Sequence, residues 1–388
     1  MNDKLKKIKI NNHDRIIQNP FGDEKGYVDY YPEYFQIEHT NRCNARCIMC
    51  NHFFLNNKDA TDINPKVIDS IIPVLKYARN IMINGDGEPF LCKNIEQYLE
   101  TYGRSEVKIG ANTNLCAISE SCFKLIAREF EFLNISCDGC TKETYEKIRR
   151  GLSFELFTKK LEQLQNIAPN VRKNLDCVVM THNLCEMPKI VDFAADFQFD
   201  KVKFHIMGVN PCIKNQDDSI LKYSAFASSI FSKVKERSDV RNIVVELPYI
   251  SGKFDENKVD FEKNCFWCVD EEEITTRQKI AMECFGELNL SNDYLAKKMT
   301  SQEWQSSFYT EHTCVWPIER CYIDVKGNMT TCCYNTRYYM GNIIEEGTFE
   351  SVWNGENYRK LRMEMRNKKM PYFCNGCMYY MTEKNKIL

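Results

Sequence analysis

Short runs rich in β-branched and aromatic residues alternate with longer amphipathic stretches between Tyr34 and Gly208. Six of the short runs have the length and composition of strands: YFQIEHT (34–40), NIMING (80–85), VKIGANT (107–113), FLNISCDG (132–139), LDCVVMT (175–181) and KVKFHIMG (201–208). The first five each precede a segment of helical periodicity, such as PKVIDSIIPVLKYARN, in which Pro65 suits a helix start. This alternation predicts an α/β fold of repeated βα units around a parallel sheet.

Polar residues gather at the carboxyl ends of the predicted strands, as in EHT, NGDG, NTN and SCDG. The active sites of βα barrels are assembled at this end of the strands. Six units are fewer than the eight that close a TIM barrel. We therefore expect residues 34–208 to form a partial (β/α)6 TIM-type barrel that is open on one side.

The regular alternation stops after Gly208. We interpret residues 1–33 as an N-terminal extension and residues 209–312 as a connecting segment that faces the substrate. That segment contains a helical piece, SAFASSIFSKVKER, and an apolar run, NIVVELPYI. Residues 313–388 are expected to form a small cysteine-rich α+β domain, in which CYIDVKGNMTTCC predicts a hairpin with its turn at 326–328.

Charge and composition indicate which binding partners and which cellular compartment the protein is expected to have. The 52 basic and 54 acidic residues nearly balance, which does not favour binding to nucleic acid or to an anionic membrane surface. The sequence has neither a signal peptide nor an apolar run long enough to span a bilayer, so we expect a cytoplasmic protein. In a reducing compartment, 20 cysteines indicate metal ligation, catalysis or burial rather than disulfides. Burial is expected for scattered cysteines such as Cys92, Cys116, Cys122, Cys137, Cys177 and Cys185.

Three cysteines with the spacing CxxxCxxC, Cys43, Cys47 and Cys50, follow the first predicted strand. Three converging thiolates can bind three irons of a 4Fe-4S cluster and leave the fourth iron without a protein ligand. An open metal position is typical of a reactive site, whereas a structural zinc site would need a second cysteine pair. The loop spacing, its place after the first strand and the number of βα units resemble those of radical S-adenosylmethionine (radical SAM) enzymes.

The resemblance implies that the open iron binds S-adenosylmethionine, which an electron from the cluster cleaves to a 5′-deoxyadenosyl radical. A protein of the flavodoxin or ferredoxin type would supply the electron. Met49 takes a position near the adenine that is more often aromatic. The stretch NGDGEP resembles the family's GGEP motif, so Gly85, Gly87, Glu88 and Pro89 are expected to hold the methionine amino group, with Asp86 as a departure.

Further cofactor contacts are expected at the ends of later strands. Asn112 and Asn114 either hydrogen-bond the cofactor or cap the next helix. The resemblance implies a polar contact at Ser136, another at Thr181 and a carboxylate clamp at Arg149 or Arg150, for which the planar guanidinium is suited. At least one arginine should be a solvated helix residue. A lone histidine on a barrel strand, such as His205, is more often a buried residue than a catalytic one. We keep His205 as a candidate catalytic residue on the substrate side.

Cys314, Cys332, Cys374 and Cys377 form a second set that could close a zinc site or a whole cluster. The segments CVWPIERCYIDVKGNMTTCCYN and FCNGC resemble the SPASM and shortened twitch domains of radical SAM enzymes, which hold auxiliary 4Fe-4S clusters. The full set of SPASM cysteines is not present, so one auxiliary cluster, and two clusters in all, is the expectation. Cys321 and Cys333 are alternative ligands, and Cys265, Cys268 and Cys284 could bind a third cluster.

These features predict an enzyme that abstracts hydrogen from a substrate carbon and oxidises or otherwise modifies the substrate. Two substrate classes stay open: a small molecule such as a sugar or aminocyclitol, and a peptide that is oxidised, crosslinked or epimerised. The short extension before the barrel disfavours a fused domain for leader-peptide recognition. A zinc-stabilised interaction module on a βα scaffold is the non-enzymatic alternative.

Overall fold

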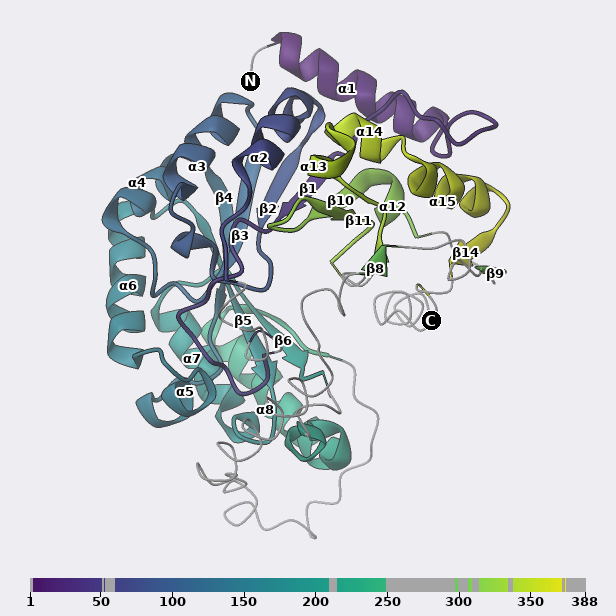
Figure 1. Cartoon of the computed structure of the whole chain (residues 1–388). Coiled ribbons are helices and arrows are strands. Elements are labelled where there is room, and N and C mark those ends of the chain that lie inside the picture. Colours follow the sequence, from purple (N-terminus) through teal and green to yellow (C-terminus); the bar gives the residue numbers. More distant parts are fainter. Residues whose placement is uncertain are drawn as a thin grey trace. The chain divides into compact units, whose positions relative to one another are not determined.

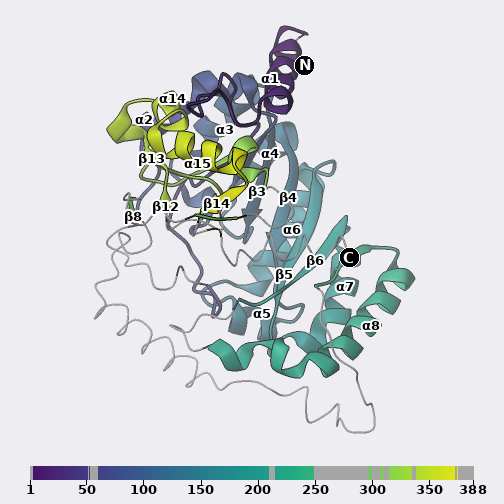
Figure 2. The ribbon, with the colours of Figure 1, turned by 90° about the vertical axis from the view of Figure 1, so that its right-hand side faces the viewer.

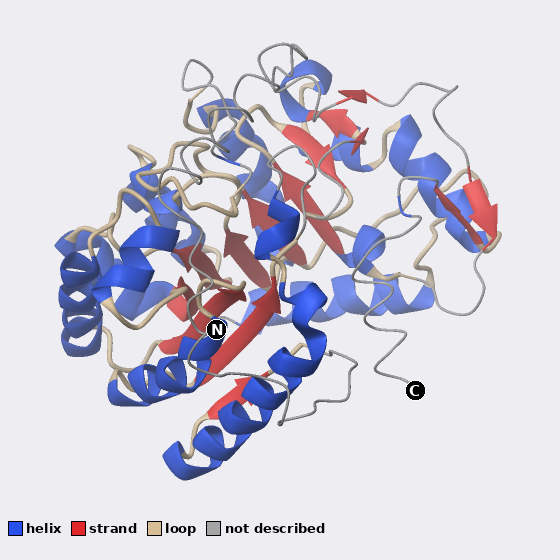
Figure 3. Ribbon diagram, turned by 90° about the horizontal axis from the view of Figure 1, so that it is seen from below, coloured by secondary structure: helices blue, strands red, loops and turns tan. Residues whose placement is uncertain are grey.

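The computed structural model describes residues 3–50, 52, 60–208, 215–248, 297–298, 306–308, 314–333, 338–371 and 374 (Figure 1). It contains two compact units. Unit 1 comprises Met1–Arg42, Lys58–Ile109 and Ser291–Leu388, and unit 2 comprises Cys43–Asn57 and Gly110–Leu290. Helices and strands alternate through the described part of residues 34–208, as the sequence predicts. Figure 3 shows the helices in blue and the strands in red. The division into units does not follow the predicted boundaries at 208 and 312, which stay predictions.

Unit 1 begins its sheet with β1 (Tyr34–Ile37) and β2 (Asn80–Ile83), which pair in parallel with Phe35 opposite Ile81. Between them lie α2 (Pro65–Ile71) and the 3-10 helix η3 (Ile72–Tyr77). The predicted helix over 65–80 therefore changes type part-way. Pro73 explains the change, because it has no N–H to donate and its ring clashes with the preceding helical turn. The unit also contains η4 (Pro89–Leu91) and α3 (Ile95–Arg104).

The carboxyl-terminal residues complete the sheet of unit 1. Strand β10 (Arg320–Ile323) pairs in parallel with β1, and β11 (Asn328–Thr330) pairs antiparallel with β10. Gly327, in the turn between them, has φ +85°, a conformation that favours glycine, and the predicted hairpin is confirmed. Strand β13 (Gly341–Asn342) adds to β11, giving the order β13-β11-β10-β1-β2. The helices here are α12 (Trp316–Glu319), α13 (Ile343–Glu346), α14 (Phe349–Trp353) and α15 (Glu356–Arg366).

The amino-terminal extension contains a helix that the sequence analysis did not predict, α1 (Asp3–Gln18). It buries Ile16 and Asn12, and the Asn12 amide exchanges two hydrogen bonds with the backbone of Tyr31, at 3.0 and 2.9 Å. Two further strand pairs in this unit are short. They are β8 (Lys297–Lys298) with β12 (Tyr338–Tyr339), and β9 (Ser306–Phe308) with β14 (Lys369–Pro371).

Unit 2 has a parallel sheet formed by β4 (Phe130–Ser136), β5 (Arg172–Val179), β6 (Lys201–Ile206) and β7 (Val244–Glu246). The chain enters the unit within β3 (Lys108–Thr113). Helices α4 (Glu120–Glu129), α6 (Phe154–Ile167) and α7 (Met187–Asp196) lie along one side of these strands (Figure 1). The other helices are α5 (Lys142–Ile148), η5 (Leu184–Glu186), η7 (Asn215–Asp218), η8 (Ile220–Tyr223) and α8 (Ser224–Arg241), the last packed beside α7 (Figure 2).

All six predicted strands are therefore present. Strand β7 lies in the segment that was expected to connect the domains and face the substrate. Their side chains alternate between two faces, as the pleat requires. One face is apolar and buried, with Leu175, Cys177 and Val179 in β5. The opposite face carries polar residues: Asn134, Ser136, Asn174, Asp176 and Lys203. Burial is confirmed for Cys92, Cys116, Cys122, Cys137 and Cys177, whereas Cys185 is half-buried.

Candidate active site

The cysteine loop of unit 2 lies against the end of α5. The Arg46 N–H donates to the Arg150 carbonyl at 2.7 Å, and the Ile48 N–H donates to the Ile148 carbonyl at 3.0 Å. Gly151 permits this approach, because it has φ +87° and a Cβ at this position would be 3.1 Å from the Asn44 carbonyl oxygen. The sequence RRG after α5 is thus a docking segment for the loop that contains the cysteines.

Each of the three loop sulfurs accepts a hydrogen bond. The Ala45 N–H donates to Cys43 Sγ at 3.4 Å, the His52 N–H donates to Cys50 Sγ at 3.4 Å, and Arg149 Nη1 donates to Cys47 Sγ at 3.9 Å. Donors around sulfur stabilise the thiolate form that binds iron, so these residues fit an iron–sulfur cluster. Within the described residues, no group of three His, Cys, Asp or Glu residues is arranged to hold a single metal ion. A cluster does not require such a group, because each thiolate binds a different iron.

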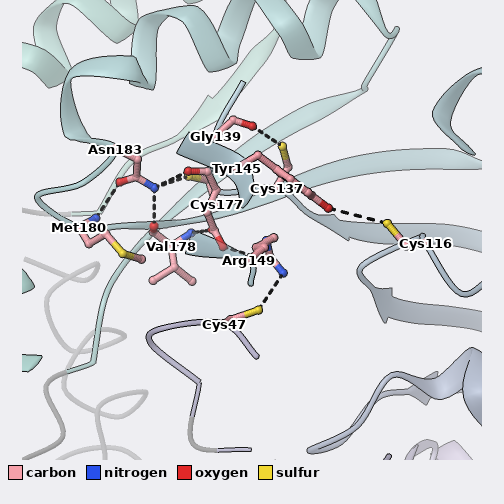
Figure 4. Close-up of polar contacts among 11 residues, drawn as sticks. Cys47, Cys116, Cys137, Gly139, Tyr145, Arg149, Cys177, Val178, Met180 and Asn183 are labelled. Carbon is pink, nitrogen blue, oxygen red and sulfur yellow. Dashed lines mark hydrogen bonds and ion pairs between the residues drawn. The ribbon is translucent and has the colours of Figure 1, made fainter. Parts of the chain in front are cut away.

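Arg149 links this loop to β4 and β5. Its Nη2 lies 2.7 Å from Asp138 Oδ2, and both side chains are buried. Burial by itself would lower the pKa of Arg149, but the carboxylate of Asp138 and the thiol of Cys47 outweigh it and raise that pKa, so the guanidinium is charged. Asp138 also accepts from the Val178 N–H at 2.7 Å. Figure 4 shows Arg149 directed at Cys47.

Asn183 fixes the end of β5 in the same network (Figure 4). Its Nδ2 donates to the carbonyls of Asp138 and Val178, both at 2.9 Å, and its Oδ1 accepts from the Met180 N–H at 2.9 Å. The side chain of Met180 forms an apolar cluster with Ile148 and Met207, against which Ile48 and Met49 pack. Met49, predicted to lie near the adenine, therefore lies beside an apolar surface of unit 2.

The remaining predicted cofactor residues of unit 2 have identifiable neighbours. Asn114 Nδ2 donates to Asn44 Oδ1 at 2.8 Å, and Asn112 Oδ1 accepts from Asn134 Nδ2 at 2.9 Å. The next helix, α4, is capped by Ser119, so the alternative that Asn112 or Asn114 caps it is wrong. Ser136, Arg150 and Thr181 are described at the end of β4, after α5 and after β5, and their cofactor contacts stay predictions.

In unit 1 the NGDGEP segment is held by Glu38, a residue that is not among the predicted cofactor contacts. The Asp86 N–H donates to Glu38 Oε1 at 2.7 Å, and the Val325 N–H donates to Oε2 at 3.2 Å. A Cβ at Gly85 would be 2.4 Å from Glu38 Cγ, and one at Gly87 would be 2.4 Å from the Thr40 carbonyl oxygen. Both positions therefore require glycine. The available signal was the place of Glu38 directly after β1, where polar residues of the predicted barrel gather.

The end of NGDGEP is also ordered by its neighbours in unit 1. The Glu88 N–H donates to the Arg42 carbonyl at 2.7 Å, and the side chain of Glu88 is buried. Pro89 begins η4, where its fixed φ suits the first helical position. Burial, followed by the charge of Asp86, raises the pKa of Glu38 well above its usual value.

His205 lies on the polar face of unit 2, where 55% of its side chain is exposed, so the expectation of a buried histidine is wrong. Its Nε2 is 3.5 Å from Asp176 Oδ1, and Lys203 Nζ is 4.0 Å from the same oxygen. Strand register places Ser136 beside Asp176, Asp176 beside Lys203, and Lys203 beside Glu246. A row of four polar residues therefore crosses β4 to β7.

The structure describes three of the four predicted carboxyl-terminal ligands. Cys314, Cys332 and Cys374 are half-buried. Cys321 is buried on β10, where burial raises its thiol pKa well above the usual value, and burial also raises the pKa of Cys333 to about 11. Cys377 and the set Cys265, Cys268 and Cys284 lie outside the described residues. The composition of an auxiliary cluster site stays a prediction.

Comparison with protein families decides the class. Residues 37–194 match the radical SAM superfamily, and residues 314–378 match SPASM, an iron–sulfur cluster-binding domain. Residues 37–194 are a radical SAM domain. This radical SAM enzyme has a carboxyl-terminal SPASM domain, and its cofactors are S-adenosylmethionine and iron–sulfur clusters. These matches support the radical SAM enzyme over the alternative of a zinc-stabilised interaction module.

The chain is similar in sequence to curated radical SAM relatives that have different functional names. Molybdenum cofactor biosynthesis protein 1 of Dictyostelium discoideum is 26% identical over 224 residues, which cover 54% of this chain and 35% of that protein. Mycofactocin maturase MftC of Mycolicibacterium smegmatis is 25% identical over 162 residues, 41% of each chain. The matches thus span less than half the length of these curated relatives.

Solved structures establish the fold. Streptococcus suis SuiB bound to precursor peptide SuiA has a TM-score of 0.57 at 14% identity, over 90% of this chain and 70% of SuiB. SuiB bound to S-adenosylmethionine has a TM-score of 0.58 at 14% identity, over 91% and 72% of the two chains. The predicted α/β fold with a carboxyl-terminal SPASM domain is confirmed. Among the described residues, no helix is long and apolar enough to cross a membrane.

Proposed function

We propose that this radical SAM enzyme removes hydrogen from a carbon of a peptide substrate and so modifies the peptide. The observation that carries the proposal is the polar row Ser136, Asp176, Lys203 and Glu246 on β4 to β7, with His205 beside it. Side chains of both charges on the polar face of β4 to β7 suit a peptide, which carries amides and charged groups. The names of MftC, a maturase, and of SuiB, bound to a precursor peptide, support this class of substrate.

Cys43, Cys47 and Cys50 would hold the cluster that binds S-adenosylmethionine, and Cys314, Cys332, Cys374 and Cys377 would hold an auxiliary cluster. When bound, these cofactors supply the radical that removes the hydrogen and an acceptor for the remaining electron. Arg150 is the better candidate for the carboxylate clamp, because Arg149 already pairs with Asp138. A flavodoxin or ferredoxin would provide the reducing electron.

His205 is the proposed base for the proton that leaves the oxidised carbon or its attached heteroatom. With Nε2 facing Asp176 Oδ1 at 3.5 Å, Nδ1 is the nitrogen that accepts the proton. Asp176 would hold the ring in this tautomer and stabilise the imidazolium that forms, in the manner of carboxylate–histidine pairs in other enzymes. Lys203 Nζ, at 4.0 Å from Asp176 Oδ1, places a positively charged group beside the same oxygen.

The test is anaerobic incubation of the reconstituted enzyme with S-adenosylmethionine, dithionite and the short peptides encoded by neighbouring genes. We expect one peptide to change mass and, when its carbon-bound hydrogens are replaced by deuterium, to transfer deuterium to 5′-deoxyadenosine. Transfer from a sugar or aminocyclitol instead, with the peptides unchanged, would overturn the peptide proposal while leaving the radical chemistry intact.

A further inference from the structure

Arg149 contacts a predicted cluster ligand directly and is itself held by a carboxylate. Its Nη1 donates to Cys47 Sγ at 3.9 Å (Figure 4). Its Nη2 lies 2.7 Å from Asp138 Oδ2. Arg149 is 6% exposed and Asp138 is fully buried. The guanidinium thus places a positive charge and a hydrogen-bond donor against one sulfur of the loop, in a site from which water is largely excluded.

We infer that Arg149 sets the reduction potential of the loop cluster through Cys47, and that Asp138 limits the size of this effect. The inference rests on the proposed assignment of Cys43, Cys47 and Cys50 as cluster ligands. Arg149 is a positioning residue in this role, because it acts through the sulfur and not on the substrate.

The physical reason is the charge of the reduced state. One electron passes from an external reductant to the cluster, and no bond forms or breaks in that step. Reduction adds a negative charge that is shared with the ligand sulfurs, and a cationic N–H donor stabilises the more negative state more strongly. The interaction is larger in a buried site than in water. Asp138 has the opposite charge and therefore opposes the effect.

A purely structural role for Arg149 is the competing explanation. Arg149 follows α5, and its neighbours Ile148 and Arg150 accept backbone hydrogen bonds from the cysteine loop. In that case, replacing Arg149 or replacing Asp138 would disturb the loop and lower the iron content in the same way. A charge effect instead predicts opposite shifts of potential when Arg149 and Asp138 are replaced separately.

The experiment is redox titration of the full chain, followed by electron paramagnetic resonance, with no substrate present. The triple variant of Cys43, Cys47 and Cys50 to alanine identifies which signal belongs to the loop cluster. We expect Arg149→Gln to lower the potential so that the reduced fraction falls about tenfold at a fixed solution potential, equivalent to about 59 mV for one electron. Arg149→Lys should restore most of the difference, and Asp138→Asn should raise the potential.

Arg172→Gln is the matched control. It removes the same charge from unit 2, but Arg172 is exposed and pairs with Glu131 at 2.8 Å, so the potential should not change.

Iron content and circular dichroism verify that each variant folds and binds its cluster. If Arg149→Gln binds no iron, the potentials of Arg149→Lys and Asp138→Asn are compared instead. The inference then requires a higher potential in Asp138→Asn than in Arg149→Lys. An unchanged potential in Arg149→Gln with full iron content, or a fall in Asp138→Asn, overturns the inference. Neither result depends on the identity of the substrate.

Discussion

The carboxylate of Glu38 accepts the backbone N–H of Asp86 at 2.7 Å, so the residue after β1 fixes the loop after β2. Its second oxygen accepts the N–H of Val325, which follows β10. One buried side chain therefore joins three strand ends of unit 1.

Replacing Glu38 by alanine should weaken both stability and cofactor binding. Two backbone N–H groups would lose their acceptor, at a cost of about 1–3 kcal/mol for each group that is left buried. The loop that contains Gly87 and Glu88 would then be less ordered. Urea unfolding and calorimetric titration with S-adenosylmethionine measure the two effects. Glu24→Ala, an exposed site in the same unit, is the control, and an unchanged affinity in Glu38→Ala would contradict a role in ordering the loop.

Replacement of Cys43, Cys47 and Cys50 by alanine should abolish formation of 5′-deoxyadenosine. If the chain holds one loop cluster and one auxiliary cluster, roughly half of the iron should remain, since each cluster contributes about four irons. Anaerobic reconstitution with iron analysis and chromatography of the nucleoside product test this prediction. Cys122→Ala, which removes a buried cysteine from α4, serves as a control for loss of a thiol. Activity that survives in the triple variant would refute the ligand assignment.

Replacement of His205 by glutamine should lower product formation by about 10²–10⁴, the usual contribution of a general base. Cleavage of S-adenosylmethionine should continue, so that 5′-deoxyadenosine exceeds the modified product. Asp176→Asn should have an effect of the same kind, because the Asn amide can donate to Nε2 and then favours the tautomer in which Nδ1 already carries a proton. The ratio of nucleoside to product and the split between kcat and KM are the measurements. A ratio that stays at one in both variants would exclude His205 as the base.

His39 should make stability depend on pH. It is buried in unit 1, with Nε2 2.8 Å from the Tyr102 hydroxyl, and burial lowers its pKa to about 4. The unfolded chain, with a pKa of about 6.5, binds the proton first, so stability is full above that pH and is lost as the pH falls toward 4. The shift is equivalent to about 3 kcal/mol. Urea unfolding of the wild type and His39→Gln between pH 4 and 7 tests this; equal slopes for the two proteins would contradict it.

Local patterns explain which parts of the fold and site were predictable. Strands such as β5 and β6 have β-rich runs bounded by turns, so their existence follows from nearby residues. The hairpin at Gly327 follows from turn chemistry in the same way. Helix α1 was missed because charged residues interrupt its apolar positions, and its burial depends on contacts with later segments.

Two site relationships could not be read from the chain. The contact of Arg149 with Cys47 joins residues 102 positions apart, and nothing in the RRG segment indicates which arginine turns inward. The approach of His205 to Asp176 depends on the parallel register of β5 and β6. Sequence periodicity gives the face on which a residue lies, but not its neighbour on the next strand.

The sequence by itself determined the class of this protein: six βα units, an open three-cysteine loop and a second set of cysteines mark a radical SAM enzyme with an auxiliary domain. Only the tertiary structure decided that β10 pairs in parallel with β1, with Cys321 opposite Phe35. The physical reason is that strand formation depends on local residues, whereas strand pairing depends on hydrogen bonds and packing between segments that lie far apart along the chain.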